Sequence, residues 1–340
     1  MAGWMAAVAE RVGLPDPVLR LGVAAMVGRT ARAMARDGGS SAGQFAGAMA
    51  DLPVALHVDV ANAQHYEVPA EFFRLVLGSR RKYSCCLYRD AVTSLDQAEV
   101  AALEETAAHA GLADGQAILE LGCGWGSLSL FMAARFPAAR IVAVSNSASQ
   151  RAVIEAEAAR RGLGNLTVVT ADMNDFEAPG RFDRIVSVEM FEHMANWRPL
   201  LARARAWLAP EGRLFLHVFS HRSTPYRFDH EDQADWIGRH FFTGGIMPSH
   251  DLIRHFADLV EVEAEWRWSG THYARTARDW RANMDRNAAA IAPILRATYG
   301  ADADLWRRRW RLFFLATEGL FGHAGGDVWG VSHYRLRPAP

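Results

Sequence analysis

The sequence lacks an excess of charge of either sign. Its 340 residues include 37 lysines and arginines against 38 aspartates and glutamates, for a formal net charge of −1. A protein without a strong positive field has little attraction for nucleic-acid phosphates or for an anionic bilayer. The balance argues against a nucleic-acid partner and favours chemistry on a small molecule.

Cysteine is scarce, and long apolar runs are absent. Cys85, Cys86 and Cys123 do not have the paired spacing of a metal site, and no basic segment followed by an apolar stretch and a cleavage site opens the sequence. We therefore expect a reduced, cytoplasmic protein without a metal. No apolar run approaches the roughly 20 residues that span a bilayer. The amphipathic segment 17–36 is expected to pack on the protein, so we predict no stable membrane insertion. A homodimer is left open.

Apolar residues make up 50% of the chain, enough for one substantial core with an appended layer. Asp16-Pro17 is typical of a helix start and Gly38-Gly39 of a helix end, which predicts a helix over 17–36. Further helices are predicted over 43–50 and from residue 69 to about 78. We assign residues 1–93 to an N-terminal helical lid that contacts substrate and cofactor, and residues 94–340 to the enzyme core.

Helical and strand patterns alternate from residue 94 onwards. Helices are predicted over 95–110, 127–135, 148–162 and 198–208, and strands over 118–121, 141–144, 166–170, 184–188 and 213–219. This order predicts a parallel sheet with helices on both faces. The later segments are predicted as a polar loop with helices over 220–256, a strand over 260–268, two long helices over 276–321 and a closing strand over 328–336. The aromatic residues at helical spacing in 306–314 are interpreted as core.

A glycine-rich segment, Glu120-Leu-Gly-Cys-Gly-Trp-Gly126, stands between a predicted strand and a predicted helix. Glycines at 122, 124 and 126 let the backbone approach a ligand closely and point free N–H groups at it. The dinucleotide-binding pattern requires a glycine three residues after Gly124, where this chain has Ser127. The pattern favours S-adenosylmethionine instead. The alternative is a tight turn that binds nothing.

The end of the second strand lacks the usual ribose-binding carboxylate. Ser145-Asn146 stands there, and Gln150, one turn into the next helix, is the candidate to bind the ribose in its place. The residues after the third strand that offer a partner for the adenine amino group and an apolar wall for its ring are Asp172, Met173 and Asn174. Asp172 as a helix cap is the alternative.

Ionisable residues cluster on both sides of the glycine-rich segment: Tyr66-Glu67 before it, and Glu189, Glu192 and His193 after it. Deprotonating an alkyl ammonium at pH 7 costs roughly 4 kcal/mol, so an amine substrate needs a proton acceptor. His193 is the natural base, and Glu192 or Glu67 would hold the ammonium. The alternative is a helix start with a buried histidine. Glu189 is the less secure member, since it could face the cofactor or a neighbouring helix. The aromatic candidates for stacking on a flat cation, each more typical of core, are Phe241, Phe242, Trp266 and Trp268.

Four motifs together resemble one enzyme superfamily. Tyr83-Ser-Cys85, Glu120–Gly126, Ser145-Asn-Ser-Ala-Ser-Gln150 and Phe191-Glu-His193 occur in the order and spacing of the cyclopropane-fatty-acid synthase superfamily of S-adenosylmethionine-dependent methyltransferases. In that superfamily the Ser/Gln pattern replaces the ribose carboxylate. The resemblance runs from about residue 65 to 336. It implies a class I, Rossmann-like α/β fold: seven strands, mostly parallel with the last antiparallel, and helical insertions at about 220–256 and 271–325.

Within the superfamily the sequence is most similar to the plant coclaurine-type N-methyltransferases. The segments that carry this likeness are 65–69, 189–194, 241–248, 270–276 and 320–322. The resemblance implies methyl transfer to a primary or secondary amine on an aromatic or alkaloid-like scaffold. The residues implied to contact the cofactor are Tyr83, Ser84, Gly122, Gly124, Gly126, Gln150, Met173, Asn174 and Val188, and those implied to line the amine site are Tyr66, Glu67, Glu192 and His193.

A lipid substrate is the first alternative. The lipid-modifying members bind bicarbonate through a set that matches Cys85, Glu192, His217 and Tyr273, which keeps open C-methylation or cyclopropanation of an unsaturated acyl chain. Those members usually have Gly or Ala where Glu189 stands, and carboxylates are costly to bury in an apolar tunnel. The second alternative is an S-adenosylmethionine-binding module without turnover.

Overall fold

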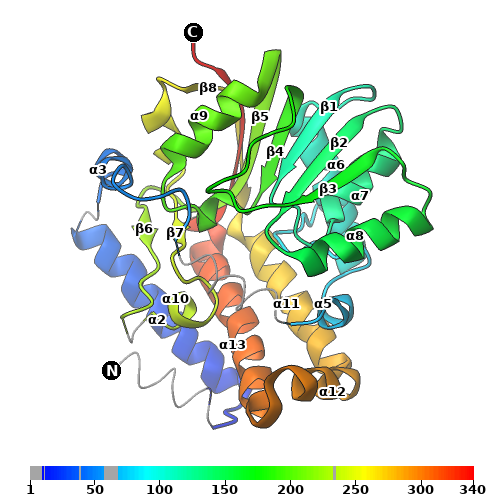
Figure 1. Cartoon of the computed structure of the whole chain (residues 1–340). Helices are drawn as coiled ribbons and strands as arrows, with labels where there is room; N and C mark the ends of the chain where they lie inside the picture. Colours follow the sequence, from blue (N-terminus) through cyan, green and yellow to red (C-terminus); the bar gives the residue numbers. More distant parts are fainter. Residues whose placement is uncertain (1–9, 11, 38–39, 57–67, 233–234) are drawn as a thin grey trace.

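A seven-stranded sheet forms the centre of the computed structural model, which describes residues 10, 12–37, 40–56, 68–232 and 235–340 (Figure 1). Its strands are β1 (Ala117–Leu121), β2 (Arg140–Ser145), β3 (Leu166–Thr170), β4 (Phe182–Val188), β5 (Leu208–His221), β8 (Val260–Ser269) and β9 (Trp329–Pro338). Their order across the sheet is β3-β2-β1-β4-β5-β9-β8. β9 pairs antiparallel with both β5 and β8, and the other pairings are parallel. The predicted class I fold, with an antiparallel last strand, is confirmed.

Helices cover both faces of the sheet, because the apolar side chains of each strand point alternately to one face and to the other. Ile118 and Val186 face α6 and α7, whereas Leu119 and Ile185 face α9. The helices of this part are α6 (Leu95–Ala110), α7 (Ser127–Arg135), α8 (Ala148–Arg160) and α9 (Trp197–Trp207). Such two-sided burial is typical of a mostly parallel sheet.

The limits of α6 show how local sequence sets these elements. Ser94 accepts a hydrogen bond from the Gln97 backbone N–H, and the Gln97 side chain bonds back to the Ser94 N–H. This capping box satisfies two donors at the helix start. The helix ends at Gly111, whose φ of 64° is left-handed and favours glycine.

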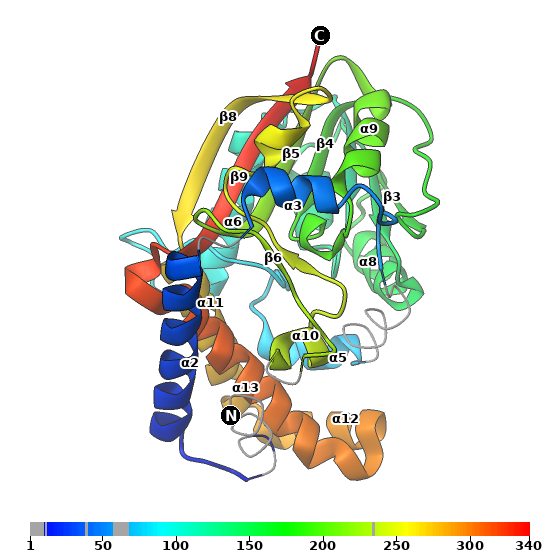
Figure 2. The ribbon, with the colours of Figure 1, turned by 90° about the vertical axis from the view of Figure 1, so that its left-hand side faces the viewer.

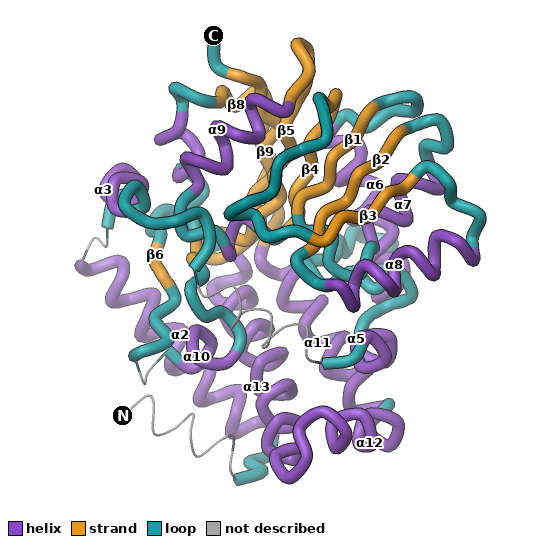
Figure 3. Tube along the Cα trace, in the orientation of Figure 1, coloured by secondary structure: helices purple, strands orange, loops and turns teal. Residues whose placement is uncertain are grey.

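A second layer of helices lies beyond the carboxyl ends of the parallel strands (Figure 3). Its main members are α5 (Ala70–Val76), α11 (Gly270–Arg286), α12 (Ala288–Tyr299) and α13 (Ala303–Gly322). The last three form one insertion between β8 and β9, where two long helices had been predicted. That prediction was wrong by one helix, because the chain turns at Asn287 and again at Gly300, whose φ is 55°. In α13, Trp310 and Phe314 are wholly buried, so their interpretation as core is confirmed. Trp306 is only half-buried, and Phe313 is buried but also lines the pocket described below.

The segment after β5 is more regular than predicted. It contains the short strand pair β6 (Tyr226–Arg227) and β7 (Ile246–Met247) with α10 (Trp236–His240) between them, where a polar loop and helices were expected. Two-residue strands carry too little alternation to be seen in a sequence. The single-turn helices are η1 (Phe191–His193), η2 (Leu252–Phe256), η3 (Gly300–Asp302) and η4 (His323–Gly326).

Near the N-terminus, α2 (Asp16–Asp37) runs along α13, and α3 (Ala42–Ala48) lies beside the sheet (Figure 2). A methyl group on Gly319 would come within 2.4 Å of Val23, so α13 needs a glycine where α2 crosses it closely. Arg20 also donates to Glu318 at 2.7 Å. No helix among the described residues combines the length and the apolar character needed to cross a bilayer.

Candidate active site

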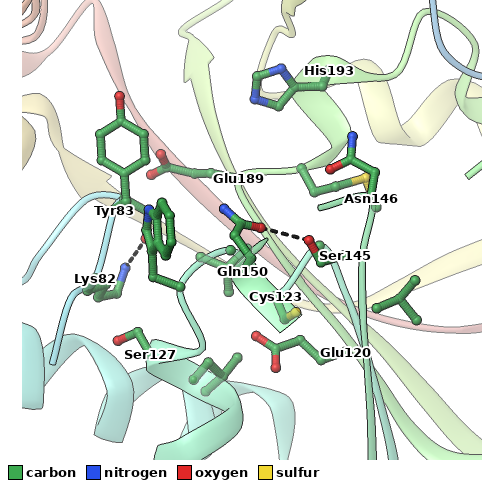
Figure 4. A pocket seen from close by; sticks show the side chains of 18 of the residues that line it. Lys82, Tyr83, Glu120, Cys123, Ser127, Ser145, Asn146, Gln150, Glu189 and His193 are labelled. Atoms are coloured by element: carbon green, nitrogen blue, oxygen red, sulfur yellow. Dashed lines mark hydrogen bonds between the residues drawn. The ribbon is translucent and has the colours of Figure 1, made fainter. Parts of the chain in front are cut away.

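A pocket of about 1510 Å³, part of it open to solvent, lies where the carboxyl ends of β1, β2 and β4 meet the helical layer (Figure 4). Ligands of open α/β sheets typically bind at this edge. The predicted cofactor residues that line the pocket are Tyr83, Ser84, Glu120, Gly122, Gly124, Ser145, Asn146, Gln150, Asp172, Met173 and Val188.

The backbone of the β1–α7 connection shapes one wall of this pocket. Gly122, Gly124 and Gly126 have φ values of 80°, 50° and 80°, a region that L side chains rarely adopt. A methyl group on Gly122 would lie 2.5 Å from the Met190 side chain, and one on Gly126 would lie 2.6 Å from Ile154. At Gly124 a methyl group would meet no atom within 4 Å. Gly126 therefore packs against Ile154 on the side of the loop away from the pocket, whereas Gly124 lines the pocket with no side chain to fill it.

Several buried donors beside this loop fit the amino-acid end of S-adenosylmethionine. Trp125 Nε1 and Ser127 Oγ are buried and have no hydrogen-bond partner among the described residues. Lys82 is 3% exposed, and its ammonium donates to Ser84 Oγ at 2.5 Å and to the Cys85 carbonyl oxygen at 2.7 Å. Unpaired buried donors are costly, and a ligand carboxylate would satisfy them. The residues present thus fit the predicted cofactor.

The ribose and adenine residues predicted from the sequence lie on the adjoining wall. Ser145 Oγ donates to Gln150 Oε1 at 2.7 Å, which leaves the Gln150 amide nitrogen turned away from Ser145 (Figure 4). Asp172 accepts from the Asn174 backbone N–H at 2.8 Å and also lines the pocket. The Asn174 side chain instead accepts from the Ala55 N–H at 3.1 Å and does not line the pocket.

Glu120 faces the pocket from β1 and is 2% exposed. Ser129 on α7 donates a short hydrogen bond to its carboxyl group. Burial raises the pKa of Glu120 to about 7, and the Ser129 hydrogen bond opposes this increase.

Glu189, directly after β4, is the centre of the opposite wall. Its carboxylate accepts from the Cys85 backbone N–H at 2.9 Å and from the Tyr273 hydroxyl at 2.6 Å, and lies 3.1 Å from His217 Nε2. These partners come from a loop, from α11 and from β5. Burial raises the pKa of Glu189, and the nearby Lys82 ammonium opposes this increase. Its φ of 48° is left-handed, a strained conformation for a side-chain-bearing residue.

Glu192 and His193 follow in η1 and point to different places. Glu192 is wholly buried, accepts from the Phe219 N–H at 2.6 Å, and does not line the pocket. Burial, and secondarily the charge of Glu189, raise the pKa of Glu192 well above its ordinary value. His193 does line the pocket, and its ring stacks on Phe242 with centroids 4.8 Å apart. The structure therefore joins Glu189 and His193 in one wall and leaves Glu192 behind it.

Other predicted residues fall elsewhere. Tyr66 and Glu67 lie outside the described residues. Cys85 and His217 are wholly buried behind Glu189, whereas Tyr273 lines the pocket. Of the aromatic candidates for cation stacking, only Phe242 lines the pocket. Phe241 packs in the core. Trp266 and Trp268, both on β8, pack against the buried histidines His109 and His217. The core role that was given as the more typical one for these residues fits Phe241 and Trp268, which are buried, while Trp266 is half-buried.

Sequence reasoning missed three kinds of pocket residue. Lys82 lines the pocket and directly precedes the Tyr83-Ser84 motif, but no pattern in the sequence had singled it out. Trp125 lies inside the glycine-rich segment, of which Glu120 and the glycines alone were predicted to contact the cofactor. Trp280 and Phe313 come from the inserted helices, and nothing local marks them as pocket residues.

Comparisons with known proteins agree with this geometry. The sequence matches the mycolic acid cyclopropane synthetase family over residues 57–330. It is 37% identical over 287 residues to (S)-coclaurine N-methyltransferase of Thalictrum flavum subsp. glaucum, covering 83% of this chain and 80% of that protein. Cyclopropane-fatty-acyl-phospholipid synthase of Escherichia coli (strain K12) is 29% identical over 274 residues, covering 80% of this chain and 67% of that protein.

One solved structure is similar over nearly the whole chain. The crystal structure of coclaurine N-methyltransferase bound to N-methylheliamine and SAH has a TM-score of 0.91 at 32% identity, covering 97% of this chain and 98% of that one. The present chain thus has the overall fold of a methyltransferase that was solved with N-methylheliamine and SAH.

Proposed function

Because the chain belongs to the mycolic acid cyclopropane synthetase family of S-adenosylmethionine-dependent methyltransferases, we propose that it methylates the nitrogen of a small aromatic or alkaloid-like amine. S-adenosylmethionine is the methyl donor, and the chain is an enzyme rather than a binding module without turnover. The N-methyltransferase relatives support an amine as the acceptor, with a benzylisoquinoline-type scaffold as the first to test.

The observation that carries this proposal is the position of the Glu189 carboxylate. Cys85, His217 and Tyr273 are three of the four residues that match the bicarbonate set of the lipid-modifying members, the fourth being Glu192. Here all three contact the Glu189 carboxylate. A carboxylate that belongs to the protein thus takes the place of an added anion. Fixed in the pocket wall, it attracts a cationic ammonium and disfavours an anionic lipid headgroup.

The residues of the pocket divide the work of methyl transfer. When bound, S-adenosylmethionine supplies a methyl group on a positively charged sulfur. The glycine-rich loop, Gln150 and Met173 would hold it, with Lys82 and Trp125 at its carboxylate. Glu189 holds the ammonium of the acceptor, and Phe242 supplies an aromatic surface for its scaffold. His193 or Glu189 takes the proton, so that the nitrogen lone pair is free to point along the axis of displacement.

The acceptor class is tested by offering two kinds of substrate to the purified protein. We expect mass spectrometry to detect methylated product from a panel of benzylisoquinoline and other secondary amines, and none from vesicles of unsaturated phospholipid. Product from the vesicles alone would reverse the assignment in favour of acyl-chain methylation or cyclopropanation.

Two variants test the roles of His193 and Glu192. His193→Ala should lower kcat at pH 7 by about 10²- to 10⁴-fold, the range for loss of a general base, with the affinity for S-adenosylmethionine nearly unchanged. Part of the loss should return at high pH, where the free amine needs no base. Glu192→Gln, a change behind the pocket wall, should have a smaller effect on kcat. Turnover of His193→Ala equal to wild type at pH 7 would remove His193 from the mechanism.

A further inference from the structure

We propose that a proton taken by Glu189 from the acceptor ammonium leaves the occupied pocket through three buried histidines, His217, His333 and His109. The last of these lies beside Glu105 at the surface. This inference rests on the proposed methylation of an amine, because a protonated acceptor must lose a proton before its nitrogen can be methylated. The histidines act through Glu189 and do not touch the substrate. They therefore have a relay role and are distinct from the pocket residues.

The chain of contacts is continuous. Glu189 Oε1 lies 3.1 Å from His217 Nε2, and His217 Nδ1 lies 2.8 Å from His333 Nε2. His333 Nδ1 lies 2.8 Å from His109 Nδ1, and His109 Nε2 lies 3.3 Å from Glu105 Oε1. Every nitrogen of the three imidazoles is used. The contacts lead from the pocket wall to the last turn of α6.

The sheet register sets up this arrangement. His217 on β5 and His333 on β9 are paired residues, and Trp266 is the partner of His333 on β8, so the three side chains lie on one face. α6 covers that face and brings in His109, whose ring stacks on Trp266 with centroids 3.8 Å apart. His217 and His333 are wholly buried, whereas the His109 and Glu105 side chains are 11% and 24% exposed.

Neutral imidazoles suit a relay, since each has one N–H donor and one lone pair. Burial lowers the pKa of His217 and His333 well below the ordinary value, which keeps both neutral at pH 7. Burial also lowers the pKa of His109, and the Glu105 charge opposes this. When Glu189 is protonated, every contact can be satisfied. Glu189 donates to His217, His217 to His333, His333 to His109, and His109 Nε2–H to the Glu105 carboxylate.

The transfer is a set of three shifts along these hydrogen bonds. The Glu189 O–H bond breaks as His217 gains a proton on Nε2, His217 loses its Nδ1 proton to His333 Nε2, and His333 loses its Nδ1 proton to His109 Nδ1. Glu189 ends as a carboxylate and His109 as an imidazolium between the Trp266 ring and the Glu105 carboxylate, both of which favour a cation. His109 then loses its Nε2 proton to water.

The same contacts return the relay to its starting state. After the product leaves, a proton from water enters at His109, the shifts run backwards, and Glu189 releases a proton at the pocket mouth. The relay thus removes a proton only while the acceptor and cofactor fill the pocket.

The charges around the two ends bear on any pH dependence. Lys82, Glu192, Cys85 and Tyr273 surround Glu189 at the pocket end, and Glu105, Arg89 and Arg335 surround His109 at the surface end. Both ends therefore hold groups of each sign, and a proton can reside at either. Moving it from Glu189 to His109 takes the positive charge away from the sulfonium site, which makes loss of the ammonium proton easier.

A matched pair of variants separates a relay from structural support. His333→Gln keeps a donor and an acceptor but cannot change tautomer, whereas His333→Phe keeps neither. With tetrahydroisoquinoline, an alkyl amine protonated at pH 7, we expect both variants to lose at least about tenfold in kcat with a KM change below about threefold. Structural support alone would be rescued by glutamine, so wild-type turnover in His333→Gln would overturn the relay.

The pH profile and an isomeric acceptor give independent readouts. The ratio of wild-type to His333→Gln kcat should fall towards one as the pH rises to where tetrahydroisoquinoline is neutral; a ratio constant over pH contradicts the relay. Tetrahydroquinoline, whose aryl amine is already neutral at pH 7, should be methylated equally by both proteins if wild type accepts it. His109→Phe, which keeps the stack on Trp266, should repeat the result if the His333 variants fail to fold. Wild-type protein that methylates no amine would instead refute the proposed function.

Discussion

The two walls of the pocket are built in different ways. The cofactor wall consists of consecutive connections after β1, β2 and β3, and its form depends on backbone conformation at glycines. The acceptor wall is assembled from side chains at Glu189, Phe242 and Tyr273, which are far apart in the sequence. The first wall is therefore determined locally, and the second exists only once the chain has folded.

This difference assigns separate tasks to the two walls. A backbone loop presents N–H groups that no substitution at a single side chain removes, which suits a cofactor shared by a whole family. A wall of side chains changes its charge with one substitution, which suits an acceptor that differs between relatives. Variants in one wall should therefore affect cofactor binding, and variants in the other should affect turnover.

The largest expected effect is on the acceptor wall. Glu189→Ala should lower kcat with an amine by about 10²- to 10⁴-fold and leave the calorimetric affinity for S-adenosylmethionine nearly unchanged. It also frees the three groups that engage the carboxylate, so added bicarbonate should restore part of the activity. Glu189→Gln fills the same space and should not respond to bicarbonate. Equal behaviour of the two variants with bicarbonate would show that the site does not exchange one carboxylate for another.

The matching test of the cofactor wall is Gly126→Ala. Its φ of 80° and the 2.6 Å approach to Ile154 should force the loop to shift. Strain and overpacking together cost about 3 kcal/mol, or roughly a hundredfold in affinity for S-adenosylmethionine by calorimetry. Gly115→Ala is the control, because its φ is 77° and its methyl group would meet nothing within 4 Å. It should destabilise the fold without changing the affinity; a similar loss in both variants would contradict a specific role for Gly126.

A third test compares the pH dependence of stability contributed by Glu120 in the cofactor wall with that of His333, which lies behind the acceptor wall. The pKa of Glu120 is about 7 in the folded protein against an ordinary value of 4.5. Between these values the folded state keeps a proton that the unfolded chain releases, so the free energy of unfolding falls as pH rises, by roughly 3 kcal/mol in all. Urea unfolding at pH 5 and pH 7 should show that Glu120→Gln removes this fall.

His333→Phe should act in the opposite direction. Folding lowers the pKa of the wild-type His333 side chain, so below about pH 6.5 the unfolded histidine binds a proton that the folded one does not. Wild-type stability then rises with pH towards 6.5 by an amount that the variant lacks. A pH profile unchanged in either variant would show that its side chain does not titrate differently on folding.

The smallest effect concerns the backbone of the acceptor wall. Glu189→Gly and Glu189→Ala both remove the carboxylate, but only glycine adopts a φ of 48° without strain. The glycine variant should be more stable by about 1 kcal/mol in urea unfolding. Equal stability would mean that the chain relaxes its conformation once the carboxylate is gone.

The contrast between the walls also explains what the sequence could predict. The order of helices and strands, the glycine loop and the Ser145–Gln150 pair follow from contiguous patterns, and the structure has them. Sequence reasoning ranked Glu192 above Glu189 as the pocket carboxylate, whereas Glu189 lines the pocket and Glu192 does not. The outcome depends on the left-handed turn at Glu189 and on the Phe219 N–H that binds Glu192, and no local pattern shows either. The contact of His217 with His333 depends on strand register, which no local pattern reveals.

The insertion between β8 and β9 has a consequence for enzyme engineering. Ser269, where β8 ends, is the register partner of Gly330 at the start of β9, so the inserted helices leave and rejoin the sheet at adjacent points. The same insertion brings Tyr273, Trp280 and Phe313 to the pocket. A graft of residues 270–328 from another family member would therefore be joined at two adjacent points, like the two ends of a surface loop. Such chimeras offer a direct way to diversify the accepted scaffold while the donor-binding half is inherited intact.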